Sequence, residues 1–135
     1  MPEKSVLIYI DGASRGNPGE SGAAAILKDG SGKVLGKTSK YLGEATNNVA
    51  EYQALLLGLK EAKKLGAKKI SIYSDSELLI KQMEGEYRVK SESLKDLFRK
   101  AIKELKKFPQ TAFSHIPREN NKEADKLANR AIDEG

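Results

Sequence analysis

The hydrophobic pattern of this chain changes its period once, close to residue 46, and that change limits the folds open to it. Before it, short β-branched or apolar runs alternate with glycine-rich turns, which is typical of consecutive antiparallel strands. After it, most apolar residues recur at helical spacing. The expected strands are 4–10, 23–28, 33–41, 69–74 and 111–116. The expected helices are 47–65, 76–84, 94–105 and 121–132. The order βββαβααβα predicts an α/β domain with a mixed five-stranded sheet flanked by helices.

Length and composition fit one domain. The chain has 135 residues with no internal repeat or long linker, so we expect a single domain over 1–135, with 1–3 and 133–135 frayed. It has no cysteine, which excludes disulfide scaffolds and thiol nucleophiles, and its one histidine excludes a histidine-rich metal site. The longest apolar run, 5–10, is too short to span a bilayer, and no signal-peptide pattern precedes it. We therefore expect a cytoplasmic protein that does not bind a membrane.

Four carboxylates stand where predicted elements begin or end. Asp11 closes the first expected strand and Asp75 closes the fourth. A helical crossover makes these two strands parallel, so both acids should lie at the sheet edge where α/β proteins place ligands. Glu51 falls one turn into the first helix and Asp125 falls in the first turn of the last. Each lies at the border of a buried face, so we expect the four side chains to converge.

Converging carboxylates repel one another unless a cation neutralises them, and ligands that offer only oxygen favour a hard ion, Mg²⁺ or Mn²⁺. The alternative is that each acid merely caps a turn or a helix, because Asp-Gly is a common turn and acids favour helix N-termini. The residues alone leave both interpretations open.

Four segments, in order, resemble the motifs of one family, type 1 ribonuclease H. They are 9–19 with Asp11, 46–55 with Glu51, 73–76 with Asp75, and 119–128 with Asp125. The resemblance covers the chain from about residue 4 to residue 133 and implies the ribonuclease H-like fold. It also implies an endonuclease that hydrolyses the RNA strand of RNA/DNA hybrids and leaves 5′-phosphate and 3′-hydroxyl ends.

The resemblance further implies two Mg²⁺ ions held by Asp11, Glu51, Asp75 and Asp125, with Mn²⁺ able to substitute. Two such ions can activate water and stabilise the leaving oxygen, so no side-chain nucleophile is needed. His115 stands ten residues before Asp125, where the family places a loop histidine that assists proton transfer or product release. The neighbouring Arg118 could share that role or replace it, and an ordinary surface histidine is the alternative.

Substrate contacts are implied by the same resemblance. The glycine-rich loop and the asparagine pair after residue 46 would contact the minor groove and the 2′-hydroxyls of the RNA strand, the groups that separate RNA from DNA. Asn17, Lys28 and Thr46 align with a pocket for a DNA-strand phosphate. A helix cap is the alternative for the residues at 46–48, and a solvated lysine for Lys28. The full expected set is Gly12, Ala13, Ser14, Arg15, Gly16, Asn17, Lys28, Thr46, Asn47 and Asn48.

The basic handle that many bacterial members insert after the second helix is missing, because 85–93 leads straight into the third helix. Basic residues at 95, 99, 100, 103, 106 and 107 could form a substitute, although a solvated helix face explains them equally well. This short form resembles archaeal-type members, some of which also act on duplex RNA, so duplex RNA is a second expected substrate.

The net charge of +5 lies entirely in 63–135, with 17 Lys and Arg against 12 Asp and Glu, and favours a polyanionic partner. We expect a monomer without an obligate protein partner. Two alternatives stay open: a module that binds hybrid or duplex RNA without cutting it, and another nuclease of the same fold, such as a junction resolvase or an exonuclease.

Overall fold

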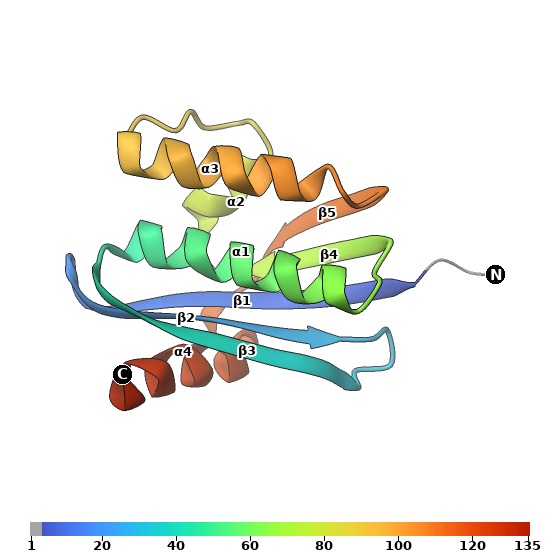
Figure 1. Cartoon of the computed structure of the whole chain (residues 1–135), viewed down its shortest axis with the longest axis horizontal. Coiled ribbons are helices and arrows are strands. Elements are labelled where there is room, and N and C mark those ends of the chain that lie inside the picture. Colours follow the sequence, from blue (N-terminus) through green and yellow to red (C-terminus); the bar gives the residue numbers. More distant parts are fainter. Residues whose placement is uncertain (1–3) are drawn as a thin grey trace.

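The computed structural model describes residues 4–135 and contains one five-stranded sheet with helices on both faces (Figure 1). The strands are β1 (Ser5–Gly16), β2 (Gly19–Lys28), β3 (Val34–Ala45), β4 (Lys69–Ser74) and β5 (Gln110–His115). The helices are α1 (Asn47–Lys64), α2 (Glu77–Met83), α3 (Glu92–Leu105), the short 3₁₀ helix η1 (Arg118–Asn120) and α4 (Lys122–Glu134). No helix within the described range is long and apolar enough to cross a membrane.

The sheet has the strand order β3-β2-β1-β4-β5, in which β1 pairs antiparallel with β2 and parallel with β4. The order of elements and the mixed five-stranded sheet confirm the predicted fold class. The parallel pair follows from the α1 crossover, since a chain that leaves β3 through a helix returns to the sheet in the direction of β1.

Helix α1 lies close against the sheet because small residues face it. A Cβ on Gly58 would come within 2.7 Å of the Ile8 side chain, and Ala25 of β2 lies 3.4 Å from the same point. Ile8, Leu55 and Ile72 belong to the core between α1 and the sheet, where they are buried almost completely. This close approach fixes how near α1 lies to β1 and β2.

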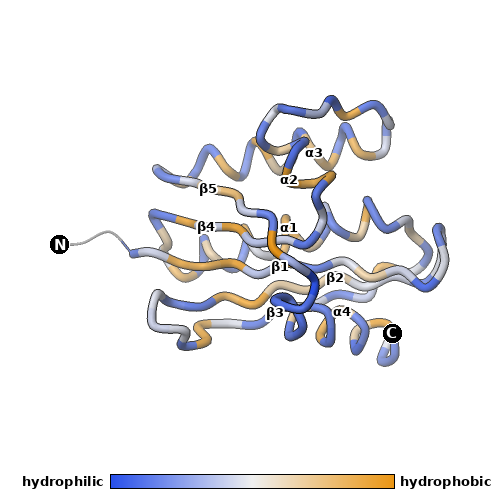
Figure 2. The backbone as a smooth tube through the Cα atoms, turned by 180° about the vertical axis from the view of Figure 1, so that it is seen from behind, coloured by the Kyte–Doolittle hydropathy of each residue, from blue (hydrophilic) through white to orange (hydrophobic). Residues whose placement is uncertain are grey.

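The two faces of the sheet are covered unequally. Helix α1 packs on β1 and β2 with α3 against it, whereas α4 packs on β2, β3 and β1 from the other side. Seen from behind, no helix lies in front of β4 and β5 (Figure 2). This part of the sheet is therefore open on the α4 side.

The first strand is longer than predicted. Asp11 does not close β1, because Gly12–Gly16 stays paired with β2 until the turn at Asn17 and Pro18. The prediction of a turn at Asp11 was wrong because the ladder to β2 satisfies the backbone of this glycine-rich segment. The pairing of β1 with β4 nevertheless ends at Ile10, so Asp11 still lies at the edge that was expected.

The chain end also differs from the prediction. Residues 133–135 were expected to fray, whereas α4 continues to Glu134. Ion pairs explain the difference: Arg15 contacts Asp133 at 2.7 Å and Arg130 contacts Glu134 at 3.0 Å. The prediction for 1–3 lies outside the described residues.

Candidate active site

The ends of two parallel strands set two of the four expected acids side by side. Ile10 of β1 is paired with Ser74 of β4, so Asp11 and Asp75 follow at one edge of the sheet. Glu51 reaches this edge from α1. One carboxylate oxygen from each of Asp11, Glu51 and Asp75 lies within 4.8 Å of the others. The structure thus brings three of the predicted residues together.

Hydrogen bonds orient the Glu51 carboxylate. The Gly12 N–H donates to Oε1 at 2.9 Å, and the Ser74 hydroxyl donates to Oε2 at 3.5 Å. Ser74 is held in turn, because its Oγ accepts from the Ser76 N–H at 3.0 Å. Position 12 requires glycine, since a Cβ there would lie 2.3 Å from the carbonyl carbon of Ala50. Glu51 is therefore fixed by the backbone against which α1 packs.

Asp125 approaches from the other side of the sheet, on the first turn of α4. It lies close enough to Asp11 to raise the pKa of that residue, although it lies outside the group of three carboxylates described above. The Asn129 amide donates to Asp125 Oδ1 at 3.3 Å, and buried Asn121 donates to the Ile10 carbonyl at 2.8 Å. Asn121 thereby attaches the start of α4 to β1 and places the fourth acid beside Asp11.

Burial and repulsion from neighbouring carboxylates raise the pKa values of Asp11 and Glu51. The pKa of Asp11 rises to about 10, chiefly through burial and then through the charges of Glu51, Asp75 and Asp125. Burial also raises the pKa of Glu51 to about 8, against the opposing hydrogen bond from the Gly12 N–H. When its carboxyl groups are ionised, the cluster needs a compensating positive charge.

The residues present fit a divalent cation. Asp75 Oδ2 is buried and has no hydrogen-bond partner within residues 4–135, so it can serve as a ligand without breaking a contact. The donors are all carboxylate oxygens, which suits a hard cation that prefers oxygen. The alternative that each acid merely caps a turn or helix does not explain three carboxylates gathered at one point.

His115 lies at the rim of the acid cluster, and Arg118 follows it on η1. His115 ends β5, and its Nε2 lies 3.3 Å from the backbone carbonyl oxygen of Asp75. Arg118 is exposed on η1, and its guanidinium forms no hydrogen bond or ion pair with the described part of the chain. Both side chains are exposed to solvent, and their roles at the acids stay predictions.

The hairpin tip and the start of α1 meet as the sequence suggested. Asn17 Oδ1 accepts a hydrogen bond from the Asn47 N–H at 3.1 Å. Thr46 is the N-cap of α1, since its Oγ1 accepts from the Val49 N–H at 3.2 Å. The cap expected at 46–48 is thus Thr46, which leaves the side chains of Asn47 and Asn48 exposed on the surface.

The other hairpin residues are divided between the surface and internal contacts. Ala13 is half-buried, Ser14 donates from Oγ to the Ala45 carbonyl at 3.0 Å, and Gly16 has a φ of +118° that favours glycine. Arg15 turns toward α4, where it pairs with Asp133. Arg15 thereby attaches the hairpin to α4.

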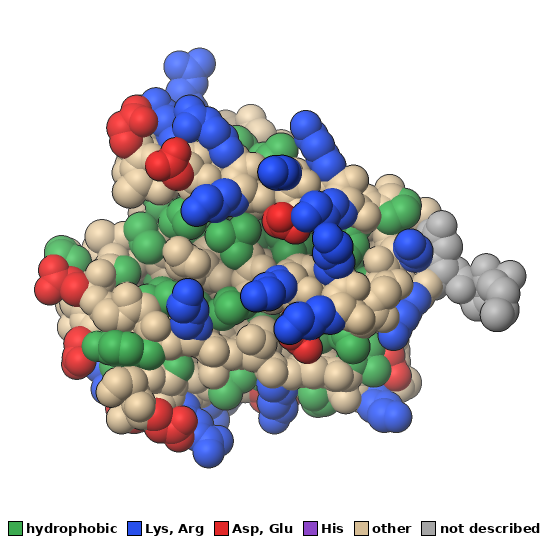
Figure 3. Space-filling view, viewed as in Figure 1, with side chains coloured by type: hydrophobic (Ala, Val, Ile, Leu, Met, Phe, Trp, Pro, Cys, Tyr) green, Lys and Arg blue, Asp and Glu red, His purple; other side chains and the backbone are tan. Residues whose placement is uncertain are grey.

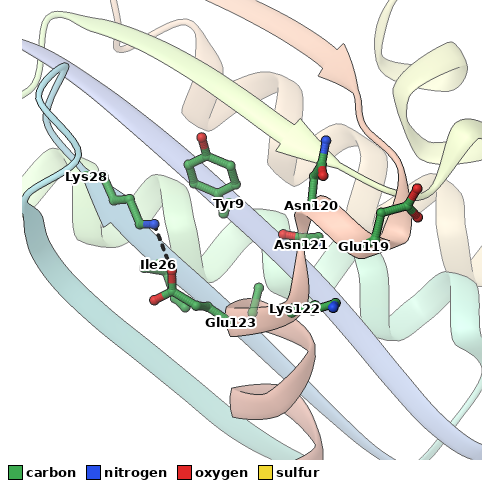
Figure 4. Close-up of a pocket in the computed structure, with 9 residues that line it drawn as sticks. Tyr9, Ile26, Lys28, Glu119, Asn120, Asn121, Lys122 and Glu123 are labelled. Atoms are coloured by element: carbon green, nitrogen blue, oxygen red, sulfur yellow. Dashed lines mark hydrogen bonds and ion pairs between the residues drawn. The ribbon is translucent and has the colours of Figure 1, made fainter.

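Lys28 does not lie with Asn17 and Thr46, so the expectation of a shared phosphate pocket is wrong. Lys28 is at the far end of β2 from the hairpin, nine residues or roughly 30 Å along the strand. Its Nζ contacts Glu123 at 2.8 Å and lies 5.2 Å from the centre of the Tyr9 ring (Figure 4). Lys28 instead helps to line a cavity of about 240 Å³ between β1, β2 and the start of α4.

Lysine and arginine side chains gather over α1 and α3 (Figure 3). Three of the expected basic residues of α3, namely Lys95, Arg99 and Lys107, pair with acids on or next to their own helix. This pairing favours the interpretation of α3 as a solvated helix face. Lys100 differs, because it lines a cavity between α1 and α3 that three α1 lysines also line: Lys60, Lys63 and Lys64.

Sequence reasoning missed the residues that orient the acids. Ser74, Asn121 and Asn129 have no catalytic chemistry, yet they hold Glu51 or the α4 segment in place. Ser74 directly precedes Asp75, and Asn121 lies four residues before Asp125. Their spacing from the acids was therefore visible, but not their hydrogen bonds.

Comparison with known proteins gives a consistent result. The family model described as reverse transcriptase-like matches residues 9–131. The bifunctional protein Rv2228c of Mycobacterium tuberculosis is 41% identical over 95% of this chain. The ribonuclease HI of Halobacterium salinarum is 38% identical over 93% of this chain. The chain spans 35% of the length of the first relative and 63% of the second.

Two solved structures agree closely with the fold. RNase H1 from Halobacterium salinarum superimposes with a TM-score of 0.94 at 37% identity, over 97% of this chain and 99% of the other. LC11-RNase H1 in complex with an RNA/DNA hybrid gives a TM-score of 0.92 at 42% identity, over 96% and 97%. Both agreements extend over nearly the whole of each chain.

Proposed function

The chain belongs to the ribonuclease H family, and from this premise we propose that it hydrolyses the RNA strand of RNA/DNA hybrids endonucleolytically, leaving 5′-phosphate and 3′-hydroxyl ends. The observation that carries the proposal is the convergence of Asp11, Glu51 and Asp75, with Asp125 close enough to raise the pKa of Asp11. Hydrolysis by this site needs no side-chain nucleophile, in agreement with a chain that contains no cysteine.

These four acids are the proposed ligands of two divalent cations, Mg²⁺ in the first place and Mn²⁺ as a substitute. When bound, such cations activate water and stabilise the leaving oxygen of an in-line displacement. The chain itself fixes the ligands: the Gly12 N–H holds the Glu51 carboxylate, and Asn129 holds Asp125. Because these contacts exist before a cation binds, little rearrangement is needed.

The hybrid is proposed to lie across the hairpin and the start of α1. Asn47 and Asn48 are exposed there beside Asn17, and the exposed glycine at 16 allows the backbone to approach a strand closely. The 2′-hydroxyl is the group such contacts would distinguish. The complex of LC11-RNase H1 with an RNA/DNA hybrid supports the same substrate class for this chain.

His115 is proposed to assist proton transfer or product release at this site. Its imidazole lies beside the Asp75 backbone and is exposed, so it is accessible to a phosphate of a strand held at the acids. Arg118, three residues on, offers a permanent positive charge that suits a phosphate contact. Separate substitutions of the two residues distinguish their roles.

Cleavage of duplex RNA is proposed from the sequence resemblance alone. A monomeric, cytoplasmic enzyme without an obligate protein partner is proposed from the sequence alone. A module that binds hybrid without cutting it is disfavoured, because all four acids are present and three of them are gathered at one point. A nuclease of this fold that prefers DNA is the second alternative for the test.

The experiment compares labelled RNA/DNA hybrid, RNA duplex and DNA duplex, each with and without Mg²⁺. The wild type should cut the hybrid only with the metal, and Asp11→Asn should abolish cutting. Asp29→Asn is the matched control, because it makes the same change at an exposed turn. Binding of hybrid without metal-dependent cleavage would refute the proposal, and equal cleavage of DNA duplex would favour the second alternative.

A further inference from the structure

The sheet carries an uncovered face next to the acid cluster. Val6, Ile8 and Ile10 of β1 point toward α1 and are buried, so the residues between them point the other way. On that other face, α4 covers β2, β3 and part of β1 and leaves β4 and β5 open (Figure 2). We call this surface the open sheet face; its residues are Leu7, Tyr9, Ser71, Tyr73, Ala112 and Ser114.

Two tyrosines stand side by side on the open sheet face. The ring centres of Tyr9 and Tyr73 are 4.9 Å apart with an interplanar angle of 17°, so the rings are stacked. On the other side of Tyr9, the Lys28 ammonium lies 5.2 Å from the ring centre. A series of three side chains therefore runs across the sheet, from Lys28 through Tyr9 to Tyr73.

The series stops at Tyr73 because the next strand offers no side chain to continue it. Tyr73 is paired in register with Ser114 of β5. Two residues earlier on the same face, Ser71 is paired with Ala112. Both of these small β5 residues are exposed, whereas Tyr73 is half-buried. Neighbouring strands are about 4.8 Å apart, so a flat ring stacked on the outer face of Tyr73 would stand above Ser114.

The two tyrosines lie close to the acids along their strands. Asp11 and Asp75 each follow a tyrosine by two residues, which is about 7 Å along the strands. The unpaired cation Arg118 lies on η1 beyond the end of β5, at the same edge. A nucleic-acid strand held at the acids would thus have an aromatic surface and a phosphate-binding cation within one or two nucleotides.

We propose that the open sheet face binds an unpaired nucleotide of a strand that continues from the hybrid, with its base stacked on Tyr73 above Ser114. The inference rests on the proposed function, since the acids must hold that strand. Aromatic side chains stack on bases of any sequence, because every base has a π-face. A protein partner fits less well, because Leu7 is the only large aliphatic residue of this surface.

The test measures the affinity of the Asp11→Asn protein for two fluorescein-labelled probes without metal, so that no cleavage occurs. One probe is a short blunt RNA/DNA hybrid, and the other carries a few unpaired nucleotides on the RNA strand, at either end in turn. One of the overhangs should lower Kd about five-fold or more, the effect expected for one stacked base.

Three further variants assign that gain to Tyr73. In the same background, Tyr73→Ser should remove the gain, whereas Tyr73→Phe should keep it because the ring remains. Ser114→Leu should also remove the gain, because the leucine would occupy the position of the stacked base while Tyr73 itself stays unchanged. Tyr41→Ser is the matched control, since Tyr41 is exposed on β3, and it should leave the gain unchanged.

Equal Kd values for blunt and overhanging hybrid, or a gain that survives Tyr73→Ser, would overturn the inference and leave the proposed nuclease function intact. Failure of the wild type to cut hybrid with Mg²⁺ would refute the proposed function instead. If the open sheet face bound a protein, Tyr73→Ser would leave both Kd values unchanged, which also counts against the inference.

Discussion

Replacing one acid of the cluster should stabilise the metal-free protein. Asp11 is buried, and its pKa is raised from 3.8 to about 10, so folding at neutral pH forces this carboxyl to stay protonated or to repel its neighbours. Asp11→Asn keeps the shape of the side chain and removes the charge. The variant should therefore unfold at a higher temperature than the wild type when a chelator removes divalent cations.

The size of the effect follows from the pKa. Below pH 3.8, Asp11 is protonated in the folded and the unfolded chain, so the substitution gains nothing there. Each pH unit above that value costs the folded wild type about 1.4 kcal/mol, or about 4 kcal/mol at pH 7 as a ceiling. Part of this cost is mutual repulsion with Glu51, Asp75 and Asp125 and does not belong to Asp11 alone. We therefore expect Asp11→Asn to raise the free energy of unfolding by about 2–4 kcal/mol, which corresponds to a rise in Tm of roughly 7–14 °C.

The assay is thermal unfolding with EDTA at about pH 4 and about pH 8, for Asp11→Asn, the wild type and Asp29→Asn. The stabilisation should be small at the lower pH and large at the higher one. Hydrogen bonds from Ser31 and Lys33 lower the pKa of Asp29, so Asp29→Asn should not stabilise the protein. A wild type as stable as Asp11→Asn at both pH values would refute the account of a repulsive, buried cluster.

Three further substitutions test individual contacts. Gly12→Ala places a Cβ 2.4 Å from the Glu51 N, so urea denaturation should show a loss of about 3 kcal/mol; an unchanged midpoint would contradict the close approach of α1. Asn121→Ala removes the buried donor to the Ile10 carbonyl and should cost about 2–3 kcal/mol in the same assay, whereas a loss under 1 kcal/mol would count against that role. Lys28→Ala breaks a partly exposed ion pair and should cost about 1 kcal/mol or less, with the loss shrinking at high salt.

The fold could be predicted wherever local signals and pairing agree. The strand predicted at 69–74 has the observed bounds Lys69–Ser74, because a β-branched run lies between Gly66 and Asp75. The first strand shows the limit of such signals. An Asp-Gly pair is typical of a turn, yet at Asp11 the antiparallel ladder with β2 continues for five more residues, to Gly16.

The acids of the site could be predicted from the sequence, but the residues that hold these acids in place could not. Asp11 and Asp75 converge because parallel strands end together, and this is a property of topology that sequence order already implies. The hydrogen bond from Asn121 to Ile10 joins residues 111 positions apart, and no local pattern indicates it. Lys28 was misplaced for a related reason, because a motif alignment contains no information on the length of β2 between that residue and the hairpin.

The cluster of acids and the close packing of α1 depend on each other. Glu51 can reach Asp11 only because position 12 lacks a side chain and Gly58 lets α1 lie against Ile8. The same closeness buries Glu51 and raises its pKa to about 8, so the packing that assembles the site also makes the site unfavourable without a cation. The apolar core between α1 and the sheet must offset that cost, since hydrophobic burial is the largest favourable contribution on this face. A substitution that loosens α1, such as Gly12→Ala, should therefore weaken the binding of a divalent cation even where the protein still folds.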